Sequence, residues 1–308
     1  MVNSTSKGKP KSPSVSIESQ LNGALVSNKQ VHYYIRDLVK FLEVKIGQDK
    51  IVSLMLFGSN TYNNDTSKIS DCDLLVILSD DVTDSQIKSL EKYFLELEIK
   101  HDLNEIQHKF LAPLLRVIEK STGMYVSHFI TRKIHWLSKK FSRIFRVNRV
   151  FAFLFAPRDI VLKSVISSSI LLIGKDLRHI DKEIEITSFG MIKSILLNLI
   201  ISIFALGISP FYHATTKYEL EAIKWSLRAS NFYLYNDTLE LEKIASRFIK
   251  LSNINKSLSK YMGRFKYLRR NPFRRSFRYS LFSPFYILKI HILGLKYKKL
   301  VKDRSLRK

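Results

Sequence analysis

The chain has 308 residues, 45% hydrophobic and 12% aromatic, enough for one large or two modest domains with buried cores. Its formal net charge of +24 points to anionic partners such as nucleotides, RNA or an acidic membrane surface. The single cysteine, Cys72, excludes an intramolecular disulfide framework, and scattered histidines offer no zinc-ligand spacing, so a cytoplasmic location is the simplest expectation.

The N-terminal part of the chain is expected to precede the folded domains. Residues 1–27 are predicted to be a disordered segment, because the stretch to Ser16 is rich in Ser, Lys and Pro and lacks the apolar core of a signal peptide. From about Asn28 to Gly47, an apolar stripe that includes Val31, Ile35 and Leu38 predicts a helix. This helix should pack on the sheet that follows.

The stretch from Ile51 to Ser79 predicts a strand, a glycine turn, a polar loop and a second strand. Gly58 lets the backbone approach a ligand closely, and Ser59 can donate a hydrogen bond to a phosphate. Asp71 and Asp73 lie two apart at the start of the second strand, so their carboxylates should share a face. Two such carboxylates favour a divalent cation, Mg²⁺ or Mn²⁺, between them.

These residues resemble the signature of the nucleotidyltransferase superfamily: Gly58-Ser59, an eleven-residue gap, then Asp71-x-Asp73 between two apolar strands. The resemblance implies an α/β (α+β) nucleotidyltransferase core with a small mixed sheet, followed by an α-helical domain. It also implies that Asp71 and Asp73 are catalytic and hold the metal, and that Gly58 and Ser59 bind the phosphates of a nucleoside triphosphate. The alternative is a loop whose aspartates are merely solvated.

After the second strand, Asp84 is predicted to cap a helix that ends near Lys100, and a second helix is predicted from Asn104 to Lys120. A third strand is predicted from Thr122 to Ile130. In the superfamily that this chain resembles, a third carboxylate often lies here, and this segment has none. His128 is a candidate base in its place, or a hydrogen-bonded structural histidine. Glu96 and Glu98 are predicted to be surface acids.

A second candidate group lies on the helix predicted around Tyr218 to Trp225. Glu221 and Lys224 are three apart and share one helical face. By resemblance to kanamycin nucleotidyltransferase, Lys224 would reach the triphosphate and Glu221 would act as the base. An ordinary ion pair within the helix explains the same pattern.

Two apolar segments bear on the domain boundaries. Residues 139–177 are predicted to be mainly helical, and their end, Leu171 to Leu177, resembles a helix terminus that precedes the helical domain. Met191 to Ile208 is near the minimum length for a membrane span, but Lys193, Asn198 and Ser202 favour a helix buried in a bundle. If it inserts, the protein is membrane-associated. The predicted parts are residues 28–178, the nucleotidyltransferase domain, and 179–250, the helical domain.

The segment from Leu251 to Lys308 is predicted to be a basic, aromatic C-terminal extension. It has seventeen Lys and Arg residues and one acid, Asp303. Basic side chains interleaved with aromatic ones suit RNA, through phosphate contacts and base stacking, and equally suit an anionic membrane surface. A solvated basic extension is the third interpretation.

The sequence therefore predicts a Mg²⁺-dependent transferase that moves a nucleoside monophosphate, with AMP from ATP as the default, to an unidentified acceptor hydroxyl or phosphate. One alternative is an antitoxin-type nucleotidyltransferase that acts on a protein partner. Another is a catalytically idle scaffold that binds RNA or membrane. The sequence leaves the acceptor, the base of the nucleotide and the third carboxylate open.

Overall fold

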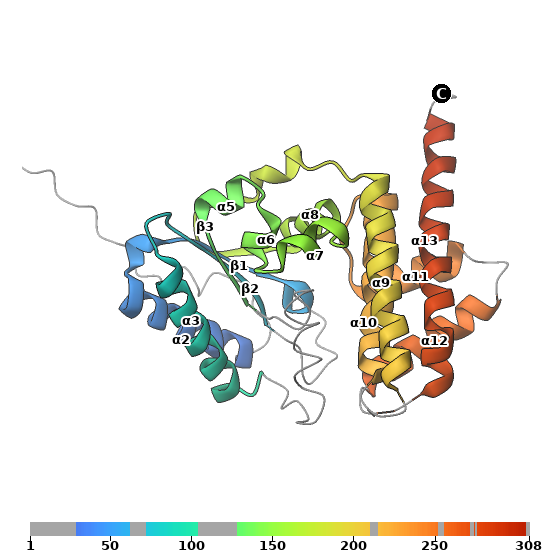
Figure 1. Ribbon diagram of the computed structural model, residues 1–308, viewed down its shortest axis with the longest axis horizontal. Helices are drawn as coiled ribbons and strands as arrows, with labels where there is room; N and C mark the ends of the chain where they lie inside the picture. The colour runs from blue at the N-terminus through green and yellow to red at the C-terminus, as the bar shows by residue number, and fades with distance from the viewer. Residues whose placement is uncertain are drawn as a thin grey trace, which may run out of the picture.

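The computed structural model describes residues 29–61, 72–103, 128–209, 215–251, 256–271, 274 and 276–305. A sheet region comes first and a helical region follows it, side by side (Figure 1). The sheet region consists of α2 (Lys29–Ile46), η1 (Gln48–Lys50), β1 (Ile51–Phe57), η2 (Gly58–Thr61), β2 (Asp73–Leu78), α3 (Asp84–Lys100), β3 (His128–Arg132), α5 (Lys133–Leu137), α6 (Phe141–Ile144), α7 (Arg149–Leu154), α8 (Arg158–Ser168), β4 (Ile170–Gly174) and η3 (Arg178–Glu183). The helical region consists of α9 (Ser188–Ile208), α10 (Thr215–Tyr235), α11 (Leu241–Leu251), α12 (Lys256–Arg270) and α13 (Phe277–Ser305).

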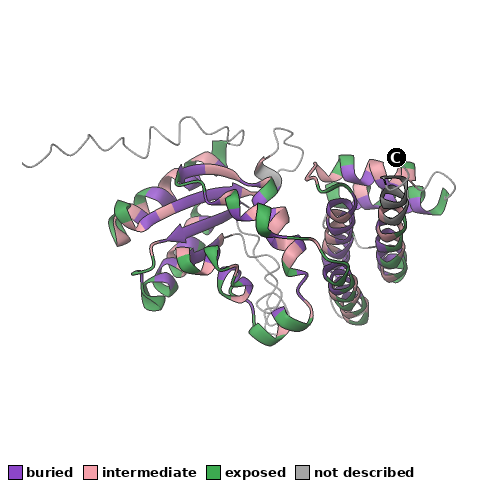
Figure 2. Cartoon of the chain, turned by 90° about the horizontal axis from the view of Figure 1, so that it is seen from above, coloured by how far each residue is buried: buried purple, intermediate pink, exposed green. Residues whose placement is uncertain are grey.

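The four strands form one mixed sheet in the order β3-β2-β1-β4. β1 is antiparallel to both β2 and β4, whereas β2 is parallel to β3. β1 and β2 are almost entirely apolar because helices cover both faces of the sheet, and Figure 2 shows these strands buried between them. This architecture, a small mixed sheet followed by a helical region, confirms the fold predicted from the sequence.

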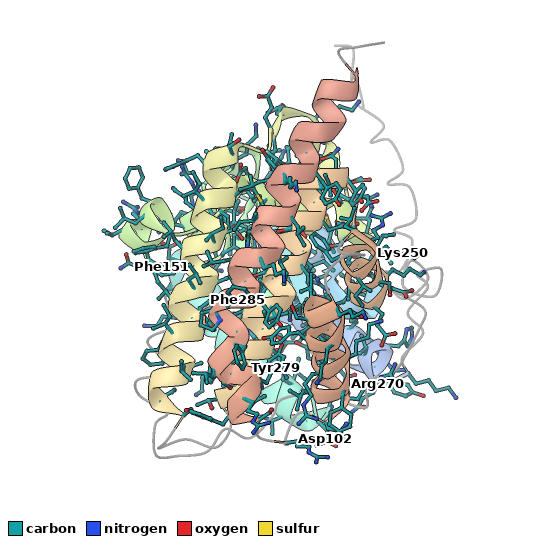
Figure 3. All side chains as sticks on the ribbon, turned by 90° about the vertical axis from the view of Figure 1, so that its right-hand side faces the viewer. Asp102, Phe151, Lys250, Arg270, Tyr279 and Phe285 are labelled. Atoms are coloured by element: carbon teal, nitrogen blue, oxygen red, sulfur yellow. The ribbon has the colours of Figure 1, made fainter. Side chains whose placement is uncertain are left out.

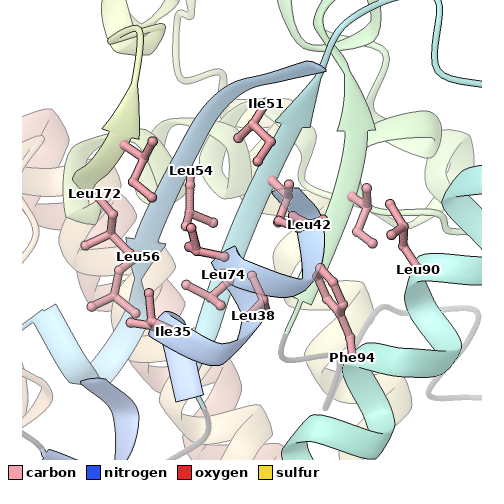
Figure 4. Packing of buried hydrophobic residues seen from close by; sticks show 14 of the residues in the cluster. Ile35, Leu38, Leu42, Ile51, Leu54, Leu56, Leu74, Leu90, Phe94 and Leu172 are labelled. Atoms are coloured by element: carbon pink, nitrogen blue, oxygen red, sulfur yellow. The ribbon is translucent and has the colours of Figure 1, made fainter. Parts of the chain in front are cut away.

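One face of the sheet packs against α2 and α3. The apolar stripe of α2, which includes Ile35 and Leu38, meets Leu54 and Leu74 of the central strands and Phe94 of α3 (Figure 4). These side chains are completely buried. α3 begins one residue earlier than a cap at Asp84 requires: Thr83 is the N-cap and forms a capping box with Gln86. The prediction that Asp84 is the cap was therefore wrong, because Asp84 already lies inside the helix.

The other face of the sheet packs against the short helices α5 to α8. Met55, Leu75 and Phe129 project into this second core. Trp136 is fully buried here, and its indole Nε1 donates a hydrogen bond to the carbonyl oxygen of Leu177 at 2.9 Å. Since alternate residues of β1 and β2 enter the two cores, the side chain of Asp73 shares the second face with that of Leu75.

The segment Ile170–Gly174 is a strand, β4, and not the helix terminus that the sequence predicted. It pairs with β1 and completes the sheet edge. Gly174 has a φ of +85°, and a Cβ there would lie 2.3 Å from the carbonyl oxygen of Val52, so no other residue fits without movement. The short apolar run does not distinguish a strand from a helix end, and only pairing with β1 decides it.

The helical region has a core of its own. α10 packs against both α9 and α13, and α11 and α12 close the remaining side. Buried residues of α12 and α13, among them Phe265 and Ile287, belong to this core together with Leu227 of α10. Residues before and after position 250 therefore share this core.

Several predicted features lie outside the described residues. They are the N-terminal segment of residues 1–27, the second helix of residues 104–120, most of the third predicted strand, and Asp71.

Candidate functional site

The turn that follows β1 and the acid that begins β2 lie against each other. Gly58 has a φ of +82°, which L-residues with side chains rarely adopt. A Cβ on Gly58 would lie 2.0 Å from Oδ2 of Asp73 and 2.9 Å from its Cγ. The carboxylate thus occupies the space that a side chain at position 58 would need. Thr61 closes the turn by donating a hydrogen bond from Oγ1 to the carbonyl oxygen of Gly58 at 2.8 Å.

The strand register explains this proximity. Asp73 is paired with Phe57, the residue before Gly58, in the antiparallel ladder of β1 and β2. The side chain of Asp73 is partly exposed, whereas the five residues that follow it in β2 are buried. The partly exposed carboxylate of Asp73 therefore lies at the start of a buried strand, beside Gly58, which has no side chain.

Gly58 borders a pocket between the sheet region and the helical region. Gly58 contributes from the sheet region, and Arg228 and Phe232 of α10 contribute from the helical region. The other lining residues are Ser164, Ser168, Asp237, Thr238, Leu239 and Ile244. Since α8 contacts both η2 and α10, it links the two regions at the pocket.

A row of half-buried side chains runs along α10 from this pocket. Glu221, Lys224 and Arg228 are spaced by three and four residues and so share one face of the helix. Glu221 and Lys224 form an ion pair, as the ordinary interpretation of the sequence predicted. Arg228 lies one turn beyond Lys224, and its guanidinium carbon is 5.9 Å from the centre of the Trp225 ring.

Burial and charge shift the pKa values of this pair. Burial raises the pKa of Glu221, but the attraction of Lys224, Arg269 and Arg228 outweighs it, so the net pKa lies below its usual value. Burial lowers the pKa of Lys224, and repulsion from Arg228 and Arg269 adds to it, while Glu221 opposes the shift. Three cations around one carboxylate give this group a net positive charge.

The far rim of the pocket is fixed by a separate ion pair. Asp237 accepts hydrogen bonds from Nη1 of Arg247 at 2.8 and 2.9 Å and from Nδ2 of Asn231 at 2.8 Å. Arg247 also lies over the ring of Tyr235, with its guanidinium carbon 4.5 Å from the ring centre. These contacts hold the segment after α10 in place, so that Thr238 and Leu239 line the pocket.

His128, the candidate base, lies on the other face of the sheet. Its Nδ1 is 2.9 Å from Oε1 of Glu98 on α3, and its ring meets the Phe94 ring edge-on at 5.1 Å. His128 is paired with Leu74, whose side chain enters the α2 and α3 core, whereas Asp73 faces the pocket side. The placement therefore gives His128 a structural partner and separates it from Asp73.

Glu98 is more buried than the sequence predicted. It is 5% exposed and points into the protein, although the sequence predicted a surface acid. Glu98 lies four residues after Phe94 and eleven after Ile87, which places it on the apolar face of α3. That spacing was the signal that could have identified it.

The remaining predicted residues are placed only in part. Ser59 lies in η2 beside Gly58, and its side chain, like all of Asp71, lies outside the described residues. Within the described part of the chain, no three His, Cys, Asp or Glu side chains gather to form a metal site. Arg228 was not predicted as a site residue. Its position four residues after Lys224 was the available signal, but only the fold shows that it faces Gly58.

The chain resembles known proteins in structure but not detectably in sequence. No family model and no curated protein matches the sequence. Among solved structures, the chain is similar to "spectinomycin adenyltransferase AAD(9) from Enterococcus faecialis with ATP and spectinomycin", with a TM-score of 0.45 and 12% sequence identity. The alignment covers 84% of this chain and 98% of that chain.

Proposed function

We propose that this protein is a nucleotidyltransferase that binds a nucleoside triphosphate between the Gly58 turn and α10 and transfers its nucleoside monophosphate to an acceptor. The observation that carries this proposal is the Asp73 carboxylate packed against Gly58, a glycine at positive φ that lines one pocket together with Arg228. Backbone N–H groups at a glycine turn can donate hydrogen bonds to phosphate oxygens, and a guanidinium can donate to the same phosphates across the pocket.

The proposed reaction is a displacement at the α-phosphorus. An acceptor oxygen forms a bond to the α-phosphorus, the bond from that phosphorus to the bridging oxygen of the β-phosphate breaks, and pyrophosphate leaves with the bonding electrons. The proton of an acceptor hydroxyl passes to a base. Arg228 would stabilise the negative charge of the triphosphate, and Gly58 would allow it to approach the backbone.

A divalent cation fits the donor set at this site. Mg²⁺ commonly binds one or two carboxylates and completes its shell with water and phosphate oxygens. Asp73, partly exposed beside Gly58, and Asp71, two residues earlier, would hold Mg²⁺ or Mn²⁺. Such an ion supplies charge neutralisation at the reacting phosphate.

In the proposed reaction, the acceptor binds beside Glu221 and Lys224 of α10. They lie roughly 10 Å and 6 Å from Arg228 along the helix axis, from the rise of about 1.5 Å per residue. Because its pKa lies below the usual value, Glu221 is ionised at neutral pH and able to accept a proton. We propose that Lys224 orients Glu221 and that Glu221 receives the acceptor proton.

The test is label transfer from each nucleoside triphosphate labelled at the α-phosphate, with Mg²⁺ and total cellular RNA, protein and small molecules as acceptors. We expect ATP to be the donor. Asp73→Asn and Asp71→Asn should each lower transfer by at least about a hundredfold, since metal stabilisation of the transition state contributes several kcal/mol. Asp49→Asn is the matched control, because Asp49 is exposed and lies before β1, at its far end from Gly58.

Transfer that is equal in the parent, Asp49→Asn and Asp73→Asn would refute the assignment. Label that appears in a co-purified protein would favour the antitoxin-type alternative, and label in RNA or a small molecule would name a different acceptor class. If Mg²⁺ and ATP do not bind to the parent protein at all, the idle scaffold replaces this proposal.

A further inference from the structure

The long apolar helix α9 is oriented with its polar side inward. Ser194, Asn198 and Ser202 are buried against the helical core. Ser194 lies 3.2 Å from Nε2 of the buried His291 on α13, and Ser202 donates a hydrogen bond to Glu219 on α10. The opposite side of α9 is apolar and exposed: Phe189, Ile192, Leu196, Ile200 and Ile203. Ile201 and Ala205 of α9 also belong to the helical core, so the exposed apolar side is not needed for packing inside the bundle and is available for another apolar surface.

α13 lies beside α9 and has a similar stripe. Its exposed apolar side chains are Phe277, Leu281, Phe282, Phe285, Leu288 and Ile292. Exposed cations bound this stripe at its two ends, Arg278 in the first turn and Lys296 one turn after Ile292. α9 and α13 are in contact, and Figures 1 and 3 show them running side by side.

The short helix α7 extends the same surface. Its Phe153 and Val150 are 67% and 66% exposed. The Lys193 side chain ties α7 to α9, because its ammonium donates to the carbonyl oxygen of Phe153 and lies 4.7 Å from the centre of the Phe189 ring. We call the exposed apolar side chains of α7, α9 and α13 the apolar face.

The charged residues within α7, α9 and the apolar stripe of α13 are all cations. Neither α7 nor α9 contains an acidic residue, and in α13 the first acid is Asp303, beyond the apolar stripe. Arg149 is exposed on α7, as Arg278 and Lys296 are on α13. An exposed apolar surface of this kind marks an interaction site in a folded protein. Cations on the same helices indicate that the partner is anionic.

We propose that the apolar face lies on the surface of an anionic lipid bilayer, with its apolar side chains in the headgroup and acyl boundary and its cations at the phosphates. α9 is, in the described part of the chain, the helix long and apolar enough to cross a membrane. Its buried polar contacts with α10 and α13 keep it in the bundle, so it lies along the bilayer.

Two other occupants fit the chemistry less well. A second copy of the chain would bring Arg278 and Lys296 of each copy to one interface, where like charges repel. RNA binds through cations and stacked aromatic rings. The exposed stripe of α9 is mainly aliphatic, and aliphatic side chains do not stack on bases.

The test is co-sedimentation of the full chain with vesicles of phosphatidylcholine alone and of phosphatidylcholine mixed with phosphatidylglycerol. The parent should bind the mixed vesicles and bind the neutral ones much less. Ile200→Glu and Phe285→Glu should each weaken binding by at least about tenfold, because a carboxylate is expelled from the acyl boundary and repelled by anionic lipid. Val44→Glu is the matched control, since Val44 is 83% exposed on α2 and lies outside the apolar face.

A second measurement reports insertion directly. Ile200→Cys carrying an environment-sensitive fluorophore should shift its emission to the blue on mixed vesicles, and Val44→Cys should not; the natural Cys72 is buried. The proposal is overturned if the parent does not bind mixed vesicles, or if the Glu variants bind them as the parent does. The membrane proposal is also overturned if the Glu variants instead convert a dimer into monomers or abolish RNA binding.

Discussion

At the scale of single residues, the site depends on Gly58 and on Asp73, whose carboxylate occupies the space that a side chain at position 58 would need. Gly58 is at positive φ, and the Asp73 carboxylate lies where its Cβ would be. The sequence predicted both residues, because a glycine after an apolar strand and an acid before the next are local features. Their contact follows from the register of two strands, which spacing alone does not fix.

Gly58→Ala should therefore damage both folding and binding. The strained φ alone costs about 1 to 2 kcal/mol for an L-residue, and the new methyl group displaces Asp73. We expect a lower melting temperature and a loss of at least about tenfold in affinity for Mg²⁺ and ATP. Gly263→Ala is the control, because a Cβ at that helical position meets nothing within 4 Å. Equal ATP affinity in the two variants would contradict the account.

His128 and Glu98 provide a contrasting prediction at the same scale. Replacing His128 with Ala removes a hydrogen-bond partner of the buried Glu98 and should cost about 1 to 3 kcal/mol of stability. The rate of nucleotide transfer should not change once both proteins are folded, because His128 faces α3. Chemical denaturation and the label-transfer assay measure these two quantities separately. A large fall in transfer rate without a fall in stability would restore His128 as a candidate base.

At the scale of elements, predictions succeeded where the local pattern was sufficient and failed where pairing or packing decided. β1 matches the apolar run of residues 51–57, because helices cover both of its faces. β4 was predicted as the end of a helix, since its five residues have no period of their own. Asn198 and Ser202 of α9 indicated from the sequence that this side of the helix is buried, but its partners could not be predicted, because His291 and Glu219 come from helices later in the chain.

Glu219 of α10 makes the stability of the helical region depend on pH. Burial raises the pKa of Glu219 from 4.5 to about 8, against the opposing hydrogen bonds of Ser202 and Ser283. The folded state therefore holds a proton that the unfolded state releases, so this contribution to stability is complete below about pH 4.5 and is lost as pH rises toward about 8. The slope is at most about 1.4 kcal/mol per pH unit.

Glu219→Gln should remove this slope and make the protein more stable than the parent at about pH 8. Urea denaturation at a series of pH values measures it. Glu242→Gln is the control, because Glu242 is an exposed partner of Arg270 on the surface. If the parent and Glu219→Gln show the same dependence on pH, then Glu219 is not protonated in the folded protein.

At the scale of the whole molecule, two regions with separate cores meet at one pocket. The sheet region supplies Gly58, with the Asp73 carboxylate packed against it, and the helical region supplies Arg228. The sequence predicted two regions and a nucleotide site in the first. It placed Lys224 and Glu221 beside that site only by resemblance, and it missed Arg228, because the packing of α10 against α8 decides which turn of the helix faces Gly58.

The central claim is that Asp73, by holding a divalent cation, and Arg228, by direct contact, bind one triphosphate. Equilibrium binding of ATP with Mg²⁺ tests it without knowledge of the acceptor, in the parent, Asp73→Asn, Arg228→Ala and the double variant. Each single change should weaken binding by about tenfold or more, and the double change by less than the product, because both groups act on one ligand. Arg264→Ala, on the exposed side of α12, should bind as the parent does. Unchanged affinity in Arg228→Ala, or two losses that multiply fully, would contradict the account.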